Sequence, residues 1–426
     1  MIRPARGALR RAAGFWRQTA PTARGLMAVR FLRSVGQGAM AVDFVLFLHA
    51  HGWPVVDIGL LLMGGGLAGA VLSLLVGTLS DRTGRRGFLL FYEGGLALGI
   101  AALLAAPVPW LIVGLAVAFG FGRGANGASG PFAPAEQAWL ARCIPAARRG
   151  VFFSINAALV FWGMGLGAAG AGILARGLPL PGLSSPYAAL FVANGLIALI
   201  NLGQIASLRE QREGRGEREE GPPSLQRMQE DRRVRRGENR ALALMVAVNA
   251  VNALGIGLIA PLLPYWFNVR FGVGPQDIGP VYAAAFTLTG AASLVVGRWS
   301  QRVGVVRAIV VPRLVGVAAF VALAVSPSFP LAAGFYLTRS VVNRGSVGVR
   351  QAFSMGLVRD RRRGLASSLN AVSMTVPAAL GPAIGGWFLG RGELIWPFVL
   401  AALLQSSYLV LFTRVMGRYA ATPGGE

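Results

Sequence analysis

Three carboxylic acids interrupt long apolar segments of the sequence, namely Asp43, Glu93 and Glu136. If these segments cross a membrane, each acid is a candidate functional residue. The reason is that a charge at the bilayer centre costs about 2.5–3.5 kcal/mol on insertion scales. A carboxyl group in that setting can bind and release a proton or hold a polar substrate. Asp43, which has apolar neighbours, is interpreted either as a proton or substrate site or as the structural partner of Arg123.

A second set of polar residues lies at helical spacing in the segment 331–357. Its members are Arg339, Asn343, Ser346 and Arg350. At about 100° per residue, these steps of four, three and four residues keep all four on one helix face. Two guanidinium groups on that face would attract a carboxylate or a phosphate group. The alternative is that Arg339 pairs locally or reaches the membrane surface and that Arg350 belongs to the helix end.

An internal repeat divides the chain into two halves. Asp57-Ile58-Gly59 recurs as Asp277-Ile278-Gly279, and Arg148-Arg149-Gly150 recurs as Arg362-Arg363-Gly364 with a similar offset. Doubled apolar halves are typical of secondary transporters, in which the substrate site lies between the halves near the bilayer midplane.

The same offset places basic residues of the second half opposite acids of the first. Arg313 is the counterpart of Glu93, and Arg350 is the counterpart of Glu136. Glu136 and Arg350 are therefore predicted to form an ion pair on the cytoplasmic side between the halves. The alternatives are that each is neutralised within its own half, or that Glu136 lies in the cytoplasmic mouth.

The composition predicts an integral membrane protein. Hydrophobic residues make up 54% of the 426 residues and charged residues 14%, with a mean hydropathy of +0.57, which is too apolar for a soluble domain of this length. Windows of about 20 apolar residues predict twelve helices. They are expected near 26–49, 57–79, 87–106, 110–141, 151–174, 186–207, 240–268, 276–297, 306–326, 331–357, 364–390 and 395–416.

Arginine in the loops predicts the topology. The net charge of +24 comes from Arg clusters that alternate with loops nearly free of Arg, so it indicates cytoplasmic loops and not nucleic-acid binding. Both termini and the charged linker are then cytoplasmic. The expected organisation is a tail at 1–25, a first bundle at 26–207, a linker at 208–239, a second bundle at 240–416 and a tail at 417–426.

The loop between the second and third spans has a recognisable pattern. It reads Gly77-x-Leu79-x-Asp81-Arg82-x-Gly84-Arg85-Arg86 and resembles the signature loop of the major facilitator superfamily. The resemblance implies that the loop latches the two halves in the outward-facing state. In the second-half copy Gln301 replaces the acid, which makes a latch on that side doubtful.

Two further motifs extend the resemblance. Arg123-x-x-Asn126-Gly127 is similar to a motif that the family often ties to proton movement, and Gly381-Pro382-x-x-Gly385-Gly386 is similar to its helix-kink element. The resemblance implies an all-α membrane protein with two pseudo-symmetric six-helix bundles around a central cavity. It also implies that the first, fourth, seventh and tenth helices line this cavity. The expected lining residues are Asn126, Asn252, Arg313, Arg339, Asn343, Ser346 and Arg350.

The sequence favours a transporter over an enzyme. It contains no nucleotide-binding loop or catalytic motif, and its single Cys143 cannot form a zinc cluster of several thiolates. No cofactor or metal is expected. The leading hypothesis is proton-coupled efflux of an amphipathic small molecule by a monomer in the cell membrane. Uptake or exchange of an organic anion, and a non-transporting receptor or scaffold with the same fold, are the alternatives.

Overall fold

A computed structural model describes residues 20–106, 108–120, 132–144, 149–174, 187–210, 225–345, 350 and 363–416. Within these ranges the secondary structure is helical and contains no strand. Nine of the described helices are long and apolar enough to cross a membrane. The structure thus confirms the expected all-α membrane fold.

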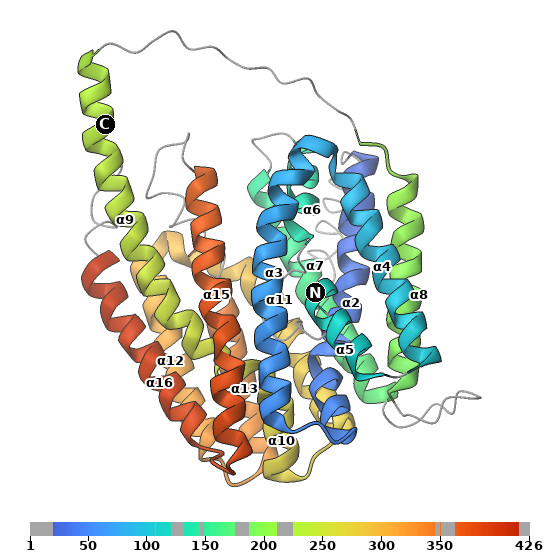
Figure 1. Cartoon of the computed structure of the whole chain (residues 1–426). Coiled ribbons are helices and arrows are strands. Elements are labelled where there is room, and N and C mark those ends of the chain that lie inside the picture. The colour runs from blue at the N-terminus through green and yellow to red at the C-terminus, as the bar shows by residue number, and fades with distance from the viewer. Residues whose placement is uncertain are drawn as a thin grey trace, which may run out of the picture.

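Seven helices are described in the N-terminal half (Figure 1). They are α2 (Pro21–Ala50), α3 (Val55–Thr83), α4 (Arg85–Ala105), α5 (Pro109–Phe119), α6 (Ala133–Arg142), α7 (Arg149–Leu174) and α8 (Ala188–Ser207). The fourth expected span is covered by α5 and α6 together.

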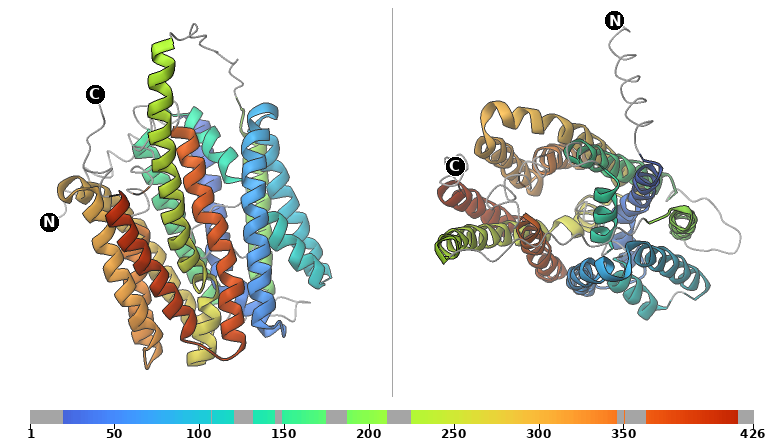
Figure 2. Two further views of the ribbon diagram at one scale, coloured as in Figure 1. Left: turned by 60° about the vertical axis from the view of Figure 1, so that its left-hand side comes forward. Right: turned by 90° about the horizontal axis from the view of Figure 1, so that it is seen from above.

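The C-terminal half repeats this order. It contains α9 (Leu225–Gly257), the 3₁₀ turn η3 (Ala260–Leu262), α10 (Leu263–Phe271), α11 (Pro275–Val303), α12 (Val305–Ala324), α13 (Phe329–Gly345), α15 (Arg363–Gly390) and α16 (Trp396–Leu411), followed by a π-helical turn at Phe412–Met416. The seventh expected span therefore consists of α9 and α10, which η3 separates. In addition, α9 begins at Leu225, within the segment expected to be a linker, and it extends beyond the bundle (Figures 1 and 2).

Local sequence signals explain several helix boundaries. Gly84 ends α3 and begins α4 with φ of 102°, and Gly304 does the same between α11 and α12 with φ of 84°. Only glycine adopts such angles without strain. The repeated Asp lies in the first turn of α3 and of α11, where the carboxylate of Asp277 accepts the backbone N–H of Gly274 at 3.2 Å. An acid in this position stabilises a helix N-terminus.

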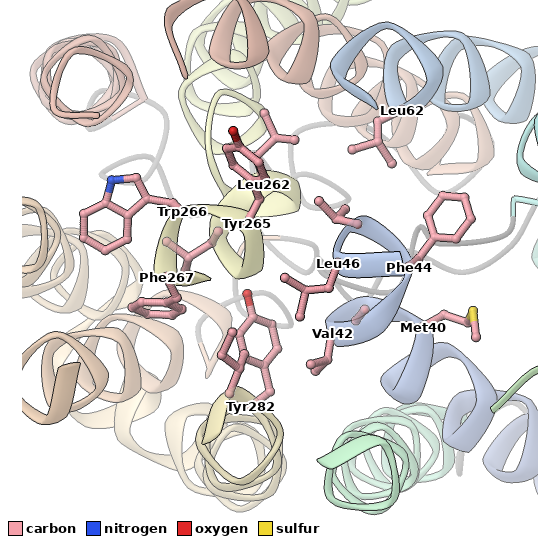
Figure 3. Packing of buried hydrophobic residues seen from close by; sticks show 14 of the residues in the cluster. Met40, Val42, Phe44, Leu46, Leu62, Leu262, Tyr265, Trp266, Phe267 and Tyr282 are labelled. Carbon is pink, nitrogen blue, oxygen red and sulfur yellow. The ribbon is translucent and has the colours of Figure 1, made fainter. Parts of the chain in front are cut away.

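The two ends of the molecule are packed differently. The linker end is the side of the molecule where α8 terminates and α9 starts. The far end is the opposite side, which contains the turn between α2 and α3. At the far end one apolar cluster joins both halves, since Phe44 and Leu46 of α2 share it with Tyr265 and Tyr282 of the other half (Figure 3). Towards the linker end each half has a separate cluster, one around Leu26 and Trp139 and the other around Met245 and Tyr408.

Two antiparallel helix pairs form most of the contact between the halves. α3 packs on α15, and α7 packs on α11. Glycines bring these backbones together: a Cβ on Gly386 would lie 2.7 Å from the carbonyl oxygen of Val55, and one on Gly172 would lie 3.2 Å from that of Pro275. In a membrane protein such small residues permit the close packing that replaces the hydrophobic drive.

Candidate functional site: buried charges in the two halves

The N-terminal half contains a buried ion-pair cluster. Arg33 of α2 donates from Nε to Oε1 of Glu93 on α4 at 2.7 Å, and from Nη1 to Oε2 of Glu136 on α6. Arg30 lies one turn earlier on α2, with its Nη1 3.5 Å from Oε1 of Glu136. Asn201 of α8 donates to Glu93 at 3.4 Å. Four helices therefore meet around these charges, and both glutamates are 1% exposed.

This N-terminal cluster is electrically balanced, because two guanidinium groups face two carboxylates. Residues 30 and 33 are three apart and therefore share a helix face, which turns both guanidinium groups towards Glu136. A buried pair of this kind offsets the desolvation cost of its charges only with good geometry and further hydrogen bonds, and Asn201 supplies one of these bonds.

The pairing of Glu136 bears on the alternatives that the sequence left open for this residue. Among the described residues its ion pairs are with Arg30 and Arg33, and none is formed with Arg350. The structure thus shows the alternative in which Glu136 is neutralised within its own half. The physical reason is that α2 packs beside α6 and brings its two arginines to this carboxylate, a pairing that was not predicted from the sequence.

Asp43 differs from the two glutamates. It lies on α2 towards the far end and is 1% exposed, and no ion pair or hydrogen bond of its carboxyl group is found among the described residues. Tyr187, which precedes α8, is near enough to sense it: burial, and then the charge of Asp43, raise the pKa of Tyr187 to about 12. Arg123, the alternative partner, lies outside the described residues.

The C-terminal half places arginine where the N-terminal half has acid. Arg313 of α12 is 2% exposed and donates from Nη1 to Oδ1 of Asn252 on α9. Its guanidinium carbon lies 4.8 Å from the ring centroid of Tyr408 on α16. Arg350 and Arg339 are near enough for their like charges to act on Arg313.

The two sets of contacts are related by the internal repeat. In each half, the first and third helices are joined by a side-chain hydrogen bond: Arg33 donates to Glu93 in one, and Arg313 donates to Asn252 in the other. In each half the sixth helix adds a further contact, from Asn201 or from Tyr408. The chemistry differs, because the pair in the N-terminal half is neutral overall, whereas the pair in the C-terminal half keeps one positive charge.

The polar face predicted for segment 331–357 is only partly described. Arg339 is 7% exposed, and its guanidinium carbon lies 3.8 Å from the ring centroid of Phe320, so it neither reaches the membrane surface nor pairs with a described carboxylate. Asn343 faces Gly316 of α12, and Arg350 is partly buried. Ser346 lies outside the described residues, as does Asn126.

The described members of the loop motif contact their own half. The backbone N–H groups of Arg85 and Arg86 donate to the carboxylate of Glu210 at 2.8 to 3.0 Å, and the side chain of Arg86 donates to the carbonyl oxygens of Ile205 and Ala206. The start of α4 and the end of α8 are thus tied together.

Gly77, at the start of the loop motif, packs within the N-terminal half. A Cβ on Gly77 of α3 would lie 3.8 Å from the Cβ of Pro134 on α6, which is an ordinary packing distance. The side chains of Asp81 and Arg82 lie outside the described residues, so the latch remains a prediction.

The Gly-Pro-x-x-Gly-Gly motif lies on α15 between two neighbours. Gly381 and Gly385 face the backbone at the end of α9 and just past it, at Gly257 and Leu258, whereas Gly386 faces α3 of the other half. Pro382 lies inside the helix, and its carbonyl oxygen is close to Gly59 of α3. The motif therefore brings α15 close to a helix of its own half and to one of the other half.

Comparison with known proteins decides the family. A family model of the Major Facilitator Superfamily matches residues 26–248 and again residues 245–425. The chain belongs to this superfamily. None of the curated proteins matches the sequence significantly. The two matched segments correspond to the two halves that the sequence repeat predicted, and the protein is therefore a secondary transporter.

Several solved transporters share the fold of this superfamily member. A bacterial homologue of the human lysosomal transporter Spinster, in an inward-facing and unoccupied conformation, gives a TM-score of 0.71 at 14% identity over 95% of this chain and 98% of that one. A D-xylose–proton symporter gives 0.68 at 14% identity, covering 91% and 97%. A human organic anion transporter, MFSD10, gives 0.62 at 17% identity, covering 92% and 100%. At these identities the similarity shows the fold.

Sequence reasoning missed four polar residues of this transporter: Arg30, Arg33, Asn201 and Glu210. The first two were detectable, because they interrupt the first apolar span three residues apart, and two buried acids elsewhere in the same half require two cations. Asn201 and Glu210 give no comparable signal, since a single amide in a span and a single acid in a charged loop are common.

Proposed function

We propose that this transporter is a proton-coupled exporter of an amphipathic small molecule and that Asp43 carries the coupled proton. The observation that supports this role is the contrast between the three intramembrane acids. Glu93 and Glu136 are bound by Arg33, and Arg30 adds to the pairing of Glu136, whereas Asp43 has no cation among the described residues. A buried carboxylate without a cation is costly, so the neutral acid is favoured while the site is closed.

The location of Asp43 fits a change in solvent access. Its neighbours Val42, Phe44 and Leu46 belong to the apolar cluster that joins the halves at the far end (Figure 3). If the halves separate there, water reaches this part of α2 and solvates an ionised carboxylate. Alternating access would then couple proton release to one side with closure towards the other.

The orientation follows from the loop charges. We place the linker end in the cytoplasm, because the loops at that end contain most of the arginines and cytoplasmic loops are enriched in them. The far end is then extracellular. The shared far-end cluster and the separate linker-end clusters support an inward-facing conformation.

An amphipathic substrate is favoured by the side chains that the halves present to one another. Leu46 and Val42 of α2 face Tyr265 and Tyr282 of the other half (Figure 3). If the halves separate at the far end, these apolar and aromatic groups would line the opened interface. Such surfaces bind apolar ligand parts with a few polar contacts for orientation.

The test is proton movement in proteoliposomes that contain the purified protein and an internal pH-sensitive dye. A thermal-shift screen of drugs, lipids, sugars and carboxylates first selects a stabilising compound. Asp43→Asn should abolish transport driven by the proton gradient and spare exchange of the compound at equilibrium, because a neutral amide can bind substrate but cannot cycle a proton. Asp57→Asn, which changes an acid in the first turn of α3 at the far end, is the matched control.

Three results would count against the proposal. Full proton-driven transport by Asp43→Asn would assign coupling to another group. Loss of equilibrium exchange in Asp43→Asn, with the same loss in Arg123→Gln, would instead support the structural pair between these two residues. Binding of the selected compound without any flux in the wild-type protein would favour a receptor or scaffold.

Exchange of an organic anion is the second candidate function. It is favoured by the buried guanidinium groups of Arg313 and Arg339, which have no carboxylate partner among the described residues. In the proteoliposome experiment, flux of a carboxylate that persists without a proton gradient would support this candidate over proton-coupled export.

A further inference from the structure

In the C-terminal half, the buried side chains of Arg313 and Arg339 form no ion pair with a described carboxylate. From residue 241 to 416 the acids are Asp277, Asp360 and Glu393. Asp277 lies in the first turn of α11 and Glu393 in the turn between α15 and α16, both at the far end, and Asp360 lies outside the described residues. Glu238 of α9 is 7% exposed, but it lies at the linker-end start of the apolar segment Gly237–Phe271, fourteen residues before Asn252. The other described candidate spans of this half, 307–324, 368–390 and 396–414, contain no carboxylate.

Arg313 is the most deeply placed of these cations. It follows the start of α12 by eight residues, which corresponds to a depth of about 12 Å from the linker end at 1.5 Å per residue. Asn252 accepts one of its hydrogen bonds and the Tyr408 ring covers it, but both groups are neutral. A buried cation that lacks a counter-ion is costly, so the site favours an anion.

Hydrogen-bond donors without acceptors gather at the same place. The Nε of Arg313 and the hydroxyl of Tyr408 are buried and form no hydrogen bond with the described residues. The same holds for the Nε2 of Gln405, which is 2% exposed and lies one helical turn from Tyr408. Buried donors are normally satisfied, and a carboxylate or phosphate offers several acceptor oxygens to such a group of donors.

Arg350 provides the approach to this site. Its charge acts on Arg313, its own Nε is without an acceptor among the described residues, and it is partly exposed. It lies past Gly345, where α13 has run from the far end to the linker end. An anion that enters from the linker end would therefore meet Arg350 before Arg313.

We propose that Arg313, Arg350 and Asn252, with Tyr408 and Gln405, form a binding site for a carboxylate or phosphate group. Arg313 and Arg350 bind the anion, Asn252 orients the guanidinium group of Arg313, and the α16 side chains add donors. The inference rests on the proposed transporter function only in taking this group to be part of the substrate, which is then an amphipathic anion.

The experiment measures thermal unfolding of the whole protein by tryptophan fluorescence, at constant ionic strength in a neutral detergent. Octyl phosphate is the anionic probe, and octyl glucoside has the same tail with a neutral head group. Octyl phosphate should raise the unfolding temperature in a dose-dependent way, and octyl glucoside should not. Arg313→Gln and Arg350→Gln should each weaken the apparent Kd for octyl phosphate at least about tenfold, which corresponds to about 1.4 kcal/mol.

Arg391→Gln is the matched control. It removes the same charge from an exposed residue at the far end, where the guanidinium stacks on Trp387, and should leave the Kd unchanged. Equal effects of the two octyl probes, an unchanged Kd in both site variants, or an equal loss in Arg391→Gln would overturn the proposal. If Arg313→Gln does not fold, Arg350→Gln alone decides.

Two further ligands in the same unfolding experiment identify the source of the anion. Inorganic phosphate tests a free anion without a tail, and nanodiscs of phosphatidylglycerol compared with phosphatidylcholine test a lipid head group. An effect in any arm that is lost in Arg313→Gln or Arg350→Gln supports the site and names its source. An effect in every arm that both variants retain contradicts it.

This experiment is separable from the test of transport. Asp43→Asn should bind octyl phosphate with the wild-type Kd, because Asp43 lies in the other half. Anion binding without proton-linked flux would remove the proposed function and leave the site. Proton-linked flux without arginine-dependent binding would remove the site and leave the function.

Discussion

At the scale of single residues, the two halves treat buried charge in opposite ways. Arg33 is surrounded by Glu93 and Glu136, whereas Arg313 is bound by the neutral side chain of Asn252. The first arrangement is complete without a ligand. The second leaves a charge that an anion would neutralise, although the two sets occupy related positions in the repeat.

This contrast predicts opposite effects of the same substitution. Arg33→Met leaves two buried carboxylates with Arg30 as their only described cation and should destabilise the protein by about 3–5 kcal/mol. Arg313→Met removes a charge that has no described counter-ion and should be neutral or stabilising. Unfolding in a detergent titration measures both.

Two controls sharpen the comparison. Adding Glu93→Gln to Arg33→Met should recover part of the lost stability, because one unpaired carboxylate is removed. Arg391→Met tests the loss of an exposed charge. If Arg33→Met and Arg313→Met lower the free energy of unfolding equally, the assignment of one balanced and one unbalanced cluster is wrong.

At the scale of elements, two neighbouring glycines of α15 contact different halves. One packs within the C-terminal half, and the other packs against the N-terminal half. On α15, Gly385 lies against the carbonyl of Leu258, just past the end of α9, and Gly386 lies against α3 of the other half. Both approaches involve backbone atoms, which cannot move aside as a flexible side chain can.

Two alanine substitutions should therefore differ in outcome. Gly385→Ala should lower the stability of the C-terminal half, by roughly 1–3 kcal/mol as for other overpacked sites. Gly386→Ala should instead weaken the far-end contact between halves and increase access there. Thermal unfolding reports the first, and labelling of a cysteine placed at His51, in a Cys143→Ser background, reports the second.

Gly334→Ala is the control for both measurements, because a Cβ at that position on α13 meets open space. Identical labelling rates in Gly386→Ala and Gly334→Ala would show that α3 and α15 do not set closure at the far end.

At the scale of the whole molecule, apolar packing distinguishes the two ends. One cluster spans both halves at the far end, while the linker end has one cluster in each half. If the two halves rock about their interface, the halves would separate at the far end and pack together at the linker end. The superfamily loop at the linker end is expected to stabilise the opposite, outward-facing state through Asp81.

Asp81→Asn should accordingly shift the protein towards the conformation that is closed at the far end, and slow transport while leaving membrane insertion intact. Spin-label pairs measure the shift: Thr83 with Arg302 at the linker end, and His51 with Arg270 at the far end, all exposed positions. The variant should lengthen the first distance and shorten the second relative to wild type. Unchanged distances together with unchanged flux would remove the latch assignment.

Much of the architecture could be predicted from the sequence because its signals are local or repeated. Apolar runs of span length, loop arginines and the duplicated Asp-Ile-Gly segments predicted a two-half membrane protein, and the superfamily motifs predicted its fold. Gly84 of the loop motif lies at the junction of α3 and α4, where its φ is 102°. Hydropathy did not place the start of α9 at Leu225 within the charged linker, because it marks the apolar part of a helix and not its polar extension.

The tertiary structure alone decided which charges are balanced. The sequence placed Glu93 and Glu136 in spans and offered Arg350 as a partner for Glu136, yet the pairing depends on how four helices meet. Helix packing brought Arg33 to both acids and Arg30 to Glu136. It left Asp43 and Arg313 without an opposite charge among the described residues. The interaction between two charges falls off with distance in space, and helix packing sets that distance between residues that lie 60 and 103 positions apart in the chain.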